Sequence, residues 1–343
     1  MLSVSVVIPT FNRAPSIERA VRSALASLAP GDEIVVVDDG SRDETERVLK
    51  PYSHLIRYIQ TDNRGAGAAR NRGLAEARNP LVAFLDSDDE WLPWRVELAR
   101  NFLETNPEVL FCFTNFRAEY GNRTLHNGLR FWTPGVRNWE ELFGPGVPYS
   151  SMAKLPPGWD DFPCHAGNVY SAMLTRGGVC TITLTVRREE AGAALHFPVD
   201  VPTYEDWWCY SRLAQRGLGA YLDCETAIQH DYRGPRLTDA DSLTCASTRL
   251  RMLEHIWGRD AAFLERNQAL YQRVLLDQKL ERVKGLIRHG LVRQACAELS
   301  RIDNAPAVLR VLALLPGPFL ALLFGVRQRL YSMRLHLTQG MPG

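Results

Sequence analysis

The sequence predicts an α/β protein with a mostly parallel sheet in its first half and a helical C-terminal extension. Three observations support this. Short apolar segments alternate with helical patterns over residues 1–115, acidic residues follow two of those segments, and helical patterns dominate after residue 245. Strands that alternate with helices favour parallel pairing through right-handed crossovers. We therefore expect a sheet domain over residues 1–245 and a helical extension over residues 246–343.

Each element of the first half has a local pattern behind it. Apolar, β-branched runs predict strands, and apolar residues at three- to four-residue spacing predict helices. The strands are expected at residues 4–8, 34–37, 56–60, 81–85 and 109–113. The helices between them are expected at residues 14–28, 41–49, 68–78 and 93–105. The second helix starts with the capping-box spacing Ser41-x-x-Glu44, in which the Ser41 hydroxyl would cap the helix.

The second half is less regular. Residues 116–175 are rich in Gly, Pro, Trp and Tyr and show little periodicity. A long irregular segment in a compact domain is typical of a lid or a binding wall, although a variable surface without a role fits equally well. Residues 181–186 alternate like a strand, and a helix is expected over residues 204–216. Its first turn holds the acids Glu205-Asp206, which the helix dipole alone could explain, and two Trp that suggest a wall against a flat ring.

The most informative stretch is the acidic turn Asp86-Ser87-Asp88-Asp89, which follows the apolar strand 81–85. Ligands of open α/β sheets bind at the carboxyl ends of the strands. Three carboxylates so close together repel one another, so a divalent cation among them is expected; the plainer alternative is a solvated acidic turn. Oxygen ligands favour Mg²⁺ or Mn²⁺, which are typically held by one or two carboxylates and substrate phosphates. The turn therefore predicts a bound diphosphate.

Three further features belong to the same edge of the predicted sheet. The turn Gly65-x-Gly67 before a helix could offer backbone N–H groups to a phosphate, but it lacks the third glycine of the dinucleotide fingerprint. Arg70, one helical turn further on, could contact a phosphate or a base. Asp39, at the end of the second strand, could accept hydrogen bonds from a nucleobase or a ribose.

Charge is distributed unevenly along the chain. The net charge is +1, but residues 249–343 carry 15 Lys and Arg against 7 Asp and Glu. An acidic front and a basic tail suggest two different partners; nucleic acid is not expected to be one of them. The seven cysteines show no metal-binding or C-x-x-C spacing, and their odd number fits reduced thiols in a cytoplasm. No signal-peptide pattern precedes the first strand, so we expect a cytoplasmic protein.

The tail contains one uncharged stretch, residues 311–326, which Pro316-Gly317-Pro318 interrupts. A spanning helix needs about 20 apolar residues. We therefore expect this stretch to be buried in the fold or to lie in a membrane interface, where the flanking arginines Arg310, Arg327, Arg329 and Arg334 would suit anionic headgroups. In the second case the protein would sit peripherally on the inner face of the cell membrane. A basic helical face packed on the catalytic domain is the equal alternative.

Taken together, the motifs resemble those of family-2 glycosyltransferases. The matching segments are Val-Val-Ile-Pro-Thr-Phe-Asn-Arg at residues 6–13, Val-Val-Asp-Asp-Gly-Ser at 36–41, Asn-Arg-Gly at 63–65 with Ala-Arg-Asn at 69–71, and Phe-Leu-Asp-Ser-Asp-Asp at 84–89. Glu205-Asp206, followed by Arg212-Leu213 and Gly217, resembles the family's later acid motif. The resemblance covers about residues 1–235, and the tail carries no motif of the family.

The resemblance implies the A-type glycosyltransferase fold, a Rossmann-like nucleotide-sugar-binding sheet, in which residues 1–115 bind the donor and 116–245 the acceptor. It also implies the roles of the donor-site residues. Pro9, Thr10 and Phe11 would line the nucleoside pocket together with Asn63 and Arg70. Asp39 would bind the base, with Asp38 as the alternative.

The resemblance assigns the acids as well. Asp86 and Asp88 would form a D-x-D pair that holds the ribose and the metal, Mn²⁺ or Mg²⁺, with Ser87 beside the donor. Because Asp89 follows directly, Asp88 and Asp89 could divide this work instead. Asp206 would be the catalytic base, with Glu205 as the alternative, and His230 would face the diphosphate.

The implied reaction is inverting transfer of a sugar from a nucleotide-sugar donor, by default a UDP-sugar, to a hydroxyl of a glycan or lipid-linked acceptor in cell-envelope polysaccharide assembly. A hydroxyl is a poor nucleophile at neutral pH, so a carboxylate should take its proton. A nucleotidyltransferase would require a basic Gly-rich loop after the first strand, and an NAD-dependent oxidoreductase would require G-x-G-x-x-G there. The sequence has Pro-Thr-Phe-Asn-Arg at this place, which disfavours both. The remaining alternative is a catalytically inactive, glycosyltransferase-like binding module.

Overall fold

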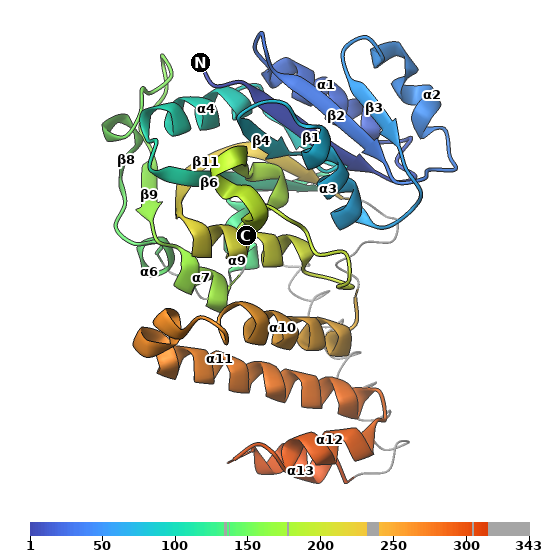
Figure 1. Ribbon diagram of the computed structural model, residues 1–343, viewed down its shortest axis with the longest axis vertical. Helices are drawn as coiled ribbons and strands as arrows, with labels where there is room; N and C mark the ends of the chain where they lie inside the picture. The colour runs from blue at the N-terminus through green and yellow to red at the C-terminus, as the bar shows by residue number, and fades with distance from the viewer. Residues whose placement is uncertain (134–135, 137, 177, 232–239, 304, 315–343) are drawn as a thin grey trace. The chain divides into compact units, whose positions relative to one another are not determined.

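The computed structural model describes residues 1–133, 136, 138–176, 178–231, 240–303 and 305–314 of the 343-residue chain. The chain forms two compact units, residues 1–235 and 236–343. The first unit is built on a mixed sheet, and the second is helical in its described part (Figure 1).

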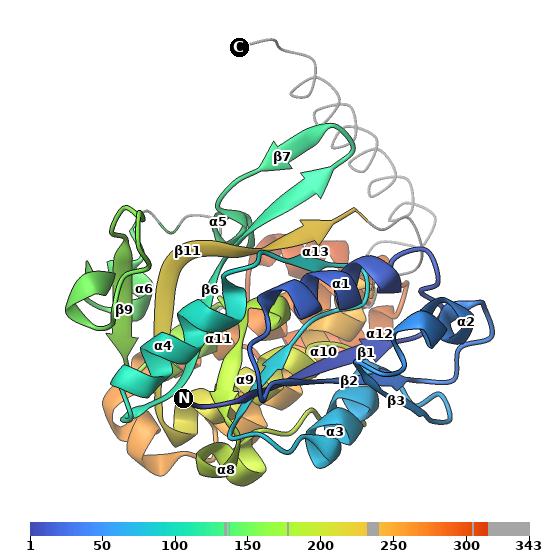
Figure 2. The ribbon, with the colours of Figure 1, turned by 90° about the horizontal axis from the view of Figure 1, so that it is seen from above.

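The sheet begins as the sequence predicts. Four parallel strands stand in the order β3-β2-β1-β4, and their bounds are β1 Val4–Thr10, β2 Glu33–Asp38, β3 Arg57–Gln60 and β4 Leu81–Phe84. Every residue of β1 and β4 is buried, which explains why these strands read as unbroken apolar runs. The helices α1 (Ile17–Ser27) and α2 (Thr45–Leu49) cover one face, and α3 (Ala66–Glu76) covers the other (Figure 2).

The sheet continues past β4 with strands of both directions. Its order is β4-β10-β6-β11-β9-β8, in which β10 runs antiparallel to both neighbours and β11 runs parallel to β6. The bounds are β6 Val109–Tyr120, β8 Val147–Pro148, β9 Pro163–Gly167, β10 Thr185–Arg187 and β11 Leu218–His230. Two short strands, β5 Glu90–Trp91 and β7 Arg123–Leu125, pair with β11 and β6. Helix α4 (Arg95–Thr105) precedes β6, and α9 (Glu205–Arg216) precedes β11.

The predicted capping box at Ser41 is wrong. Helix α2 begins at Thr45 after the N-cap Glu44, and no side chain caps it. The Ser41 hydroxyl instead accepts a hydrogen bond from the Asn12 backbone N–H at 2.8 Å, while the Ser41 N–H donates to Asp38 Oδ1. Ser41 therefore ties the loop after β1 to the loop after β2, and this long-range use overrides the local pattern.

The expected strand at residues 181–186 is only half correct. Residues Thr181–Thr183 form a short 3-10 turn, and the strand β10 occupies Thr185–Arg187. The alternation of polar and apolar residues suggested a strand with one buried and one exposed face. All of these residues are buried, so the alternation does not mark such a strand. The predicted strand 109–113 was too short, since β6 extends to Tyr120.

The irregular region 116–175 holds several short elements. They are α5 Gly128–Trp132, α6 Glu140–Phe143, the 3-10 turn Tyr149–Ser151 and α7 Tyr170–Thr175, beside the strands β7 to β9. Half of its aromatic residues are buried: Trp139 and Phe143 are each 4% exposed and pack against the Tyr221 ring at centroid distances of 5.2 and 5.1 Å. Phe131 and Trp132 are exposed at 58% and 45%. The aromatic composition of this region is therefore divided between the core and the surface.

The second unit contains α10 (Ser242–Ile256), α11 (Ala261–Arg288), α12 (Val292–Leu299) and α13 (Ala307–Leu312). Val283, Leu286, Ile287, Ala295 and Leu299 form part of its buried core. In the described part of the chain, no helix combines the length and apolarity that crossing a bilayer requires. Most of the uncharged stretch 311–326, and Arg327, Arg329 and Arg334 with it, lies outside the described residues.

Candidate active site

The site forms where parallel strands end together. β1 ends at Thr10, β2 at Asp38 and β4 at Phe84, so the loops that carry the predicted residues emerge at one edge of the sheet. The first turn of α9 brings two further acids, Glu205 and Asp206, to this edge. Glu205 contacts Arg70, which lies 135 positions earlier in the chain.

Asp39 organises the loop around the Gly-rich turn. Its Oδ1 accepts the Arg64 N–H at 2.8 Å, and its Oδ2 accepts the Gly65 N–H at 2.7 Å. Burial raises the pKa of Asp39 above its usual value, and these two backbone hydrogen bonds oppose the rise. The alternative acid, Asp38, is fully buried and accepts hydrogen bonds from the Ser41 N–H and the Tyr58 hydroxyl.

The glycine turn has one of its backbone N–H groups occupied within the protein. The Gly65 N–H is directed to Asp39, so it is already engaged. Gly65 has φ +91°, which favours glycine, and Gly67 is needed for space because a Cβ there would lie 3.3 Å from the Glu205 side chain. The turn therefore positions Asp39 and allows close packing of α3 on the segment before α9.

The other predicted nucleoside contacts lie around this loop. Pro9 and Thr10 are buried, and the Thr10 hydroxyl oxygen is shielded without a hydrogen-bond partner. Phe11 is 41% exposed, which leaves its ring accessible at the end of β1. Asn63 is exposed beside Gly40.

The acidic turn separates its three carboxylates by exposure. The side chains of Asp86 and Asp88 are 29% and 24% exposed, whereas Asp89 is 5% exposed. Asp89 Oδ1 accepts the His230 N–H at 3.0 Å, and burial raises the pKa of Asp89 well above its usual value, reinforced by the charges of Asp88 and Asp86. Ser87 is also buried. The geometry thus leaves Asp86 and Asp88 as the accessible pair.

Two arginines that the sequence analysis did not select support Asp88. The Arg13 Nε lies 3.6 Å from Asp88 Oδ2, and an Arg19 Nη2 donates to the Asp88 backbone carbonyl. Arg13 lies in the loop after β1 and Arg19 in α1. Arg13, the basic residue that ends the motif 6–13, was the available signal, because the loop after a strand lies next to the acids that follow the neighbouring strand.

Arg70 joins the two acid motifs. Its guanidinium donates to Asp86 Oδ1 at 2.8 Å and to Glu205 Oε1 at 2.9 Å, and it lies over the Phe197 ring at 5.4 Å. Arg70 is 5% exposed, and the charges of Asp86 and Glu205 raise its pKa against the effect of burial. Sequence reasoning expected a phosphate or base contact; the structure shows a bridge between two carboxylates.

Asp206 directly follows Glu205 in the first turn of α9 and is contacted by uncharged donors. Its Oδ1 accepts the Trp207 N–H at 2.6 Å, and the Thr181 hydroxyl lies 3.5 Å from its Oδ2. Burial and the charge of Glu205 raise the pKa of Asp206 to about 6, while Arg70 acts in the opposite direction. A carboxyl group with this pKa is largely ionised at neutral pH yet remains a competent proton acceptor. Tyr204, directly before the motif, has the strained left-handed φ of +63°.

Two carboxylates contact the imidazole ring of His230. Its Nε2 lies 3.0 Å from Glu90 Oε2, and its Nδ1 lies 3.5 Å from Glu119 Oε2. Together with the Asp89 contact, His230 fixes the end of β11 to the acidic turn. Its neighbours Tyr232 and Arg233 lie outside the described residues.

The accessible acids fit a hard divalent cation. Asp86 and Asp88 offer two carboxylates that are separated by one residue, Ser87. Mg²⁺ or Mn²⁺ typically binds one or two carboxylates and completes its coordination shell with substrate phosphates. Over the described ranges no group of three or more His, Cys, Asp or Glu forms a ready metal site. The structure describes all seven cysteines and pairs none of them in a disulfide.

Known proteins resemble this chain in sequence and in fold. Residues 5–173 match the family model described as Glycosyl transferase family 2. A relative from Escherichia coli, the UDP-Glc:alpha-D-GlcNAc-diphosphoundecaprenol beta-1,3-glucosyltransferase WfaP, is 34% identical over 118 residues, which are 34% of this chain and 47% of that protein. The chain covers less than half the length of the curated relatives it matches.

Two solved structures share the fold. The S. aureus TarS fragment 1–349 with UDP aligns with a TM-score of 0.54 at 16% identity, over 84% of this chain and 72% of that one. The Pyrobaculum calidifontis mannosyltransferase PcManGT with GDP-Man and Mn²⁺ aligns with a TM-score of 0.55 at 19% identity, over 93% and 80%. The predicted A-type glycosyltransferase fold is confirmed. Residues 5–173, about half of the chain, therefore carry a domain of the family-2 glycosyltransferase type.

Proposed function

We propose that the protein transfers a sugar from a nucleotide-sugar donor to a hydroxyl group with inversion, and that Asp206 is the general base. The observation that carries the proposal is the Arg70 bridge. It holds Asp86, at the donor edge of the sheet, next to the helix start that bears Asp206. A donor bound at the first motif would thereby have a proton acceptor within the same site.

The base is assigned to Asp206 and not to Glu205 for a physical reason. Glu205 is 8% exposed and its carboxylate is paired with Arg70, which makes it a poor proton acceptor. Asp206 is more exposed and has a pKa raised to about 6. As the acceptor hydroxyl attacks the anomeric carbon from the face opposite the leaving group, Asp206 takes its proton, an effect typically worth about 10²–10⁴-fold in rate.

The donor half has a binding role. Asp39, whose backbone N–H donates to the Thr10 carbonyl, would accept hydrogen bonds from a base, and Phe11, the residue after Thr10, has an exposed ring that could contact the nucleoside. Asp86 and Asp88 would hold Mn²⁺ or Mg²⁺, which when bound supplies Lewis-acid stabilisation of charge on the departing diphosphate. Arg13 and Arg19 keep the Asp88 loop in place for that role.

A UDP-sugar is the donor we favour, because the WfaP name includes UDP-Glc and the TarS structure contains UDP. The WfaP acceptor carries a diphosphoundecaprenol, so a lipid-linked glycan in cell-envelope assembly is the acceptor class we favour here. Residues 116–245 would shape the acceptor side. A peripheral contact of the basic tail with anionic membrane on the cytoplasmic face would suit such an acceptor.

The test is a panel of nucleotide sugars in the presence of Mn²⁺. A thermal-shift screen identifies the donor, because a ligand that binds the folded state raises apparent stability. Nucleotide release from that donor then measures slow hydrolysis or transfer. We expect one nucleotide class to stabilise the protein and to be released by the wild type and not by Asp206→Asn. Stabilisation without release from either protein would instead indicate an inactive binding module, and no stabilisation by any donor would refute the proposal.

A further inference from the structure

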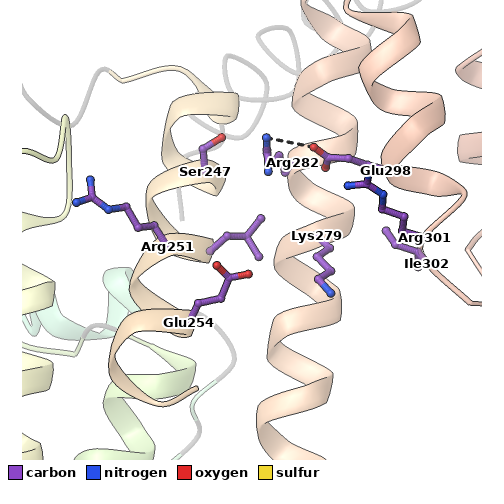
Figure 3. Close-up of a pocket in the computed structure, with 9 residues that line it drawn as sticks. Ser247, Arg251, Glu254, Lys279, Arg282, Glu298, Arg301 and Ile302 are labelled. Atoms are coloured by element: carbon purple, nitrogen blue, oxygen red, sulfur yellow. Dashed lines mark ion pairs between the residues drawn. The ribbon is translucent and has the colours of Figure 1, made fainter. Parts of the chain in front are cut away.

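The helical unit contains a cavity of about 360 Å³ that the transfer reaction does not use. It lies between α10, α11 and the end of α12 (Figure 3). Leu250 and Ile302, which are each 6% exposed, contribute an apolar part of the lining. The rest of the wall is polar and predominantly basic, with contributions from three different helical segments.

The basic side chains of the cavity have spare donors. Arg282 pairs with Glu298 at 3.1 Å, but its Nε is buried and has no hydrogen-bond partner. Within the described chain, Lys279 and Arg301 form no ion pair. In Figure 3 the Arg301 guanidinium extends from the end of α12 towards Arg282. Three cations therefore face one carboxylate on this side, which leaves positive charge to be neutralised.

The opposite wall carries acceptors. Ser247 and Glu254 extend from α10 towards α11 (Figure 3). A hydroxyl and a carboxylate in this position can bind hydroxyl groups of a ligand, since both accept hydrogen bonds. A simple anion would gain nothing from Glu254, whereas a ligand with an anionic end and a hydroxylated end would use both walls.

We propose that this cavity binds a phosphate ester that carries hydroxyl groups. The phosphate would lie among Lys279, Arg282 and Arg301, because charge-assisted hydrogen bonds to Arg and Lys are the strongest that a phosphate finds in proteins. The hydroxyls would face Ser247 and Glu254. Such a group occurs in soluble sugar phosphates and in the glycerophosphate headgroup of lipids. The proposal uses no residue of the catalytic unit and is independent of the proposed reaction.

The test compares two double variants of the full chain with the same change in charge. Lys279→Gln with Arg301→Gln alters the cavity. Arg273→Gln with Arg293→Gln alters exposed residues of α11 and α12 outside it. Glucose 1-phosphate is titrated by calorimetry without metal ions, and vesicles of phosphatidylglycerol are tested by co-sedimentation against phosphatidylcholine. Circular dichroism and melting curves check that both variants fold.

We expect the cavity variant to bind the effective probe at least about tenfold more weakly, and the control variant to stay within about twofold of the wild type. Loss confined to glucose 1-phosphate identifies a soluble ligand, and loss confined to vesicles identifies a headgroup. Equal loss in both variants would mean that only net charge matters and would overturn the proposal. Failure of the wild type to bind either probe would overturn it as well.

Discussion

Two of the adjacent acid pairs in the chain, residues 88–89 and 205–206, lie at the candidate site, and the surroundings of the two members differ in the same way in both pairs. Asp89 is buried and holds the His230 backbone, while Asp88 remains accessible. Glu205 is buried and holds Arg70, while Asp206 has a raised pKa and is contacted by the uncharged Trp207 N–H and Thr181 hydroxyl. One acid of each pair anchors the site, and its neighbour is the one to which we assign a role in the proposed reaction. The comparison distinguishes the two carboxylates of each pair, which look equivalent in the sequence.

Asp206→Asn is expected to have the largest effect on activity. Removing the proposed base should lower transfer by about 10²–10⁴-fold, because the acceptor hydroxyl loses its proton acceptor. Donor binding should hardly change, because Asp206 takes no part in holding the donor. Steady-state transfer rates and a calorimetric titration with the nucleotide diphosphate measure the two quantities. Near-normal turnover of this variant would show that the base lies elsewhere.

Asp88→Asn is expected to act on the other half of the comparison. The neutral amide is a weaker ligand than a carboxylate for a hard cation. Mn²⁺ should therefore strengthen nucleotide-diphosphate binding at least about tenfold less than in the wild type. Even residues that only hydrogen-bond to a metal ligand have effects of this size when they are substituted. Titrations with and without Mn²⁺ measure it. Binding without metal should be unchanged. An unaltered response to Mn²⁺ would remove Asp88 from the metal site.

Arg70→Gln tests the connection between the two pairs. It leaves Asp86 and Glu205 without their shared cation, and removal of one partner from a buried ion pair typically costs about 3–5 kcal/mol of unfolding free energy. Arg72→Gln, which removes an exposed pair with Glu76 on the same helix, is the control and should cost about 1 kcal/mol or less. Denaturant unfolding of both variants checks the difference. Equal destabilisation of the two variants would mean that the Arg70 bridge stabilises the fold no more than an exposed ion pair does.

The smallest effect on activity is expected for Asp89→Asn. The amide oxygen can still accept the His230 N–H, and the buried charge is removed. Since burial raises the pKa of Asp89, the folded state loses stability as the pH rises from the unfolded pKa through the folded one. The variant should therefore be at least as stable as the wild type at pH 7, and its advantage should vanish at pH 3. Thermal unfolding at the two pH values decides this, and an activity loss as large as that of Asp88→Asn would abolish the distinction.

Much of the donor half could be predicted from sequence. The strands β1, β2 and β4 are short, predominantly apolar and followed or ended by Pro-Thr or by acids, so both their positions and their shared edge follow from local pattern. Family resemblance supplied the fold and the proposed roles of Asp39, Asp88 and Asp206. These elements are the ones in which local preference and tertiary contacts agree.

The remaining features depend on contacts between distant residues. Nothing near Arg70 in the sequence reveals that its second partner is Glu205, 135 positions away. The distinction between Asp88 and Asp89 depends on the His230 backbone, which arrives with β11. In residues 116–175 the short elements carry too few turns for a period to be recognised, and half of the aromatic residues there are buried in the core. Ser41 has the spacing of a cap, but its hydroxyl is used by Asn12.

The central claim is that Asp206 is the base and that Glu205 and Arg70 set its ionisation. The pH dependence of the transfer rate in the wild type and in Glu205→Gln tests this most directly. A base must be deprotonated to act, so the wild-type rate should rise with pH through about 6 and then level off. The charge of Glu205 raises the pKa of Asp206, so Glu205→Gln should move this rise to lower pH. A rise at the same pH in both proteins, or no rise between about pH 5 and 8, would contradict the account.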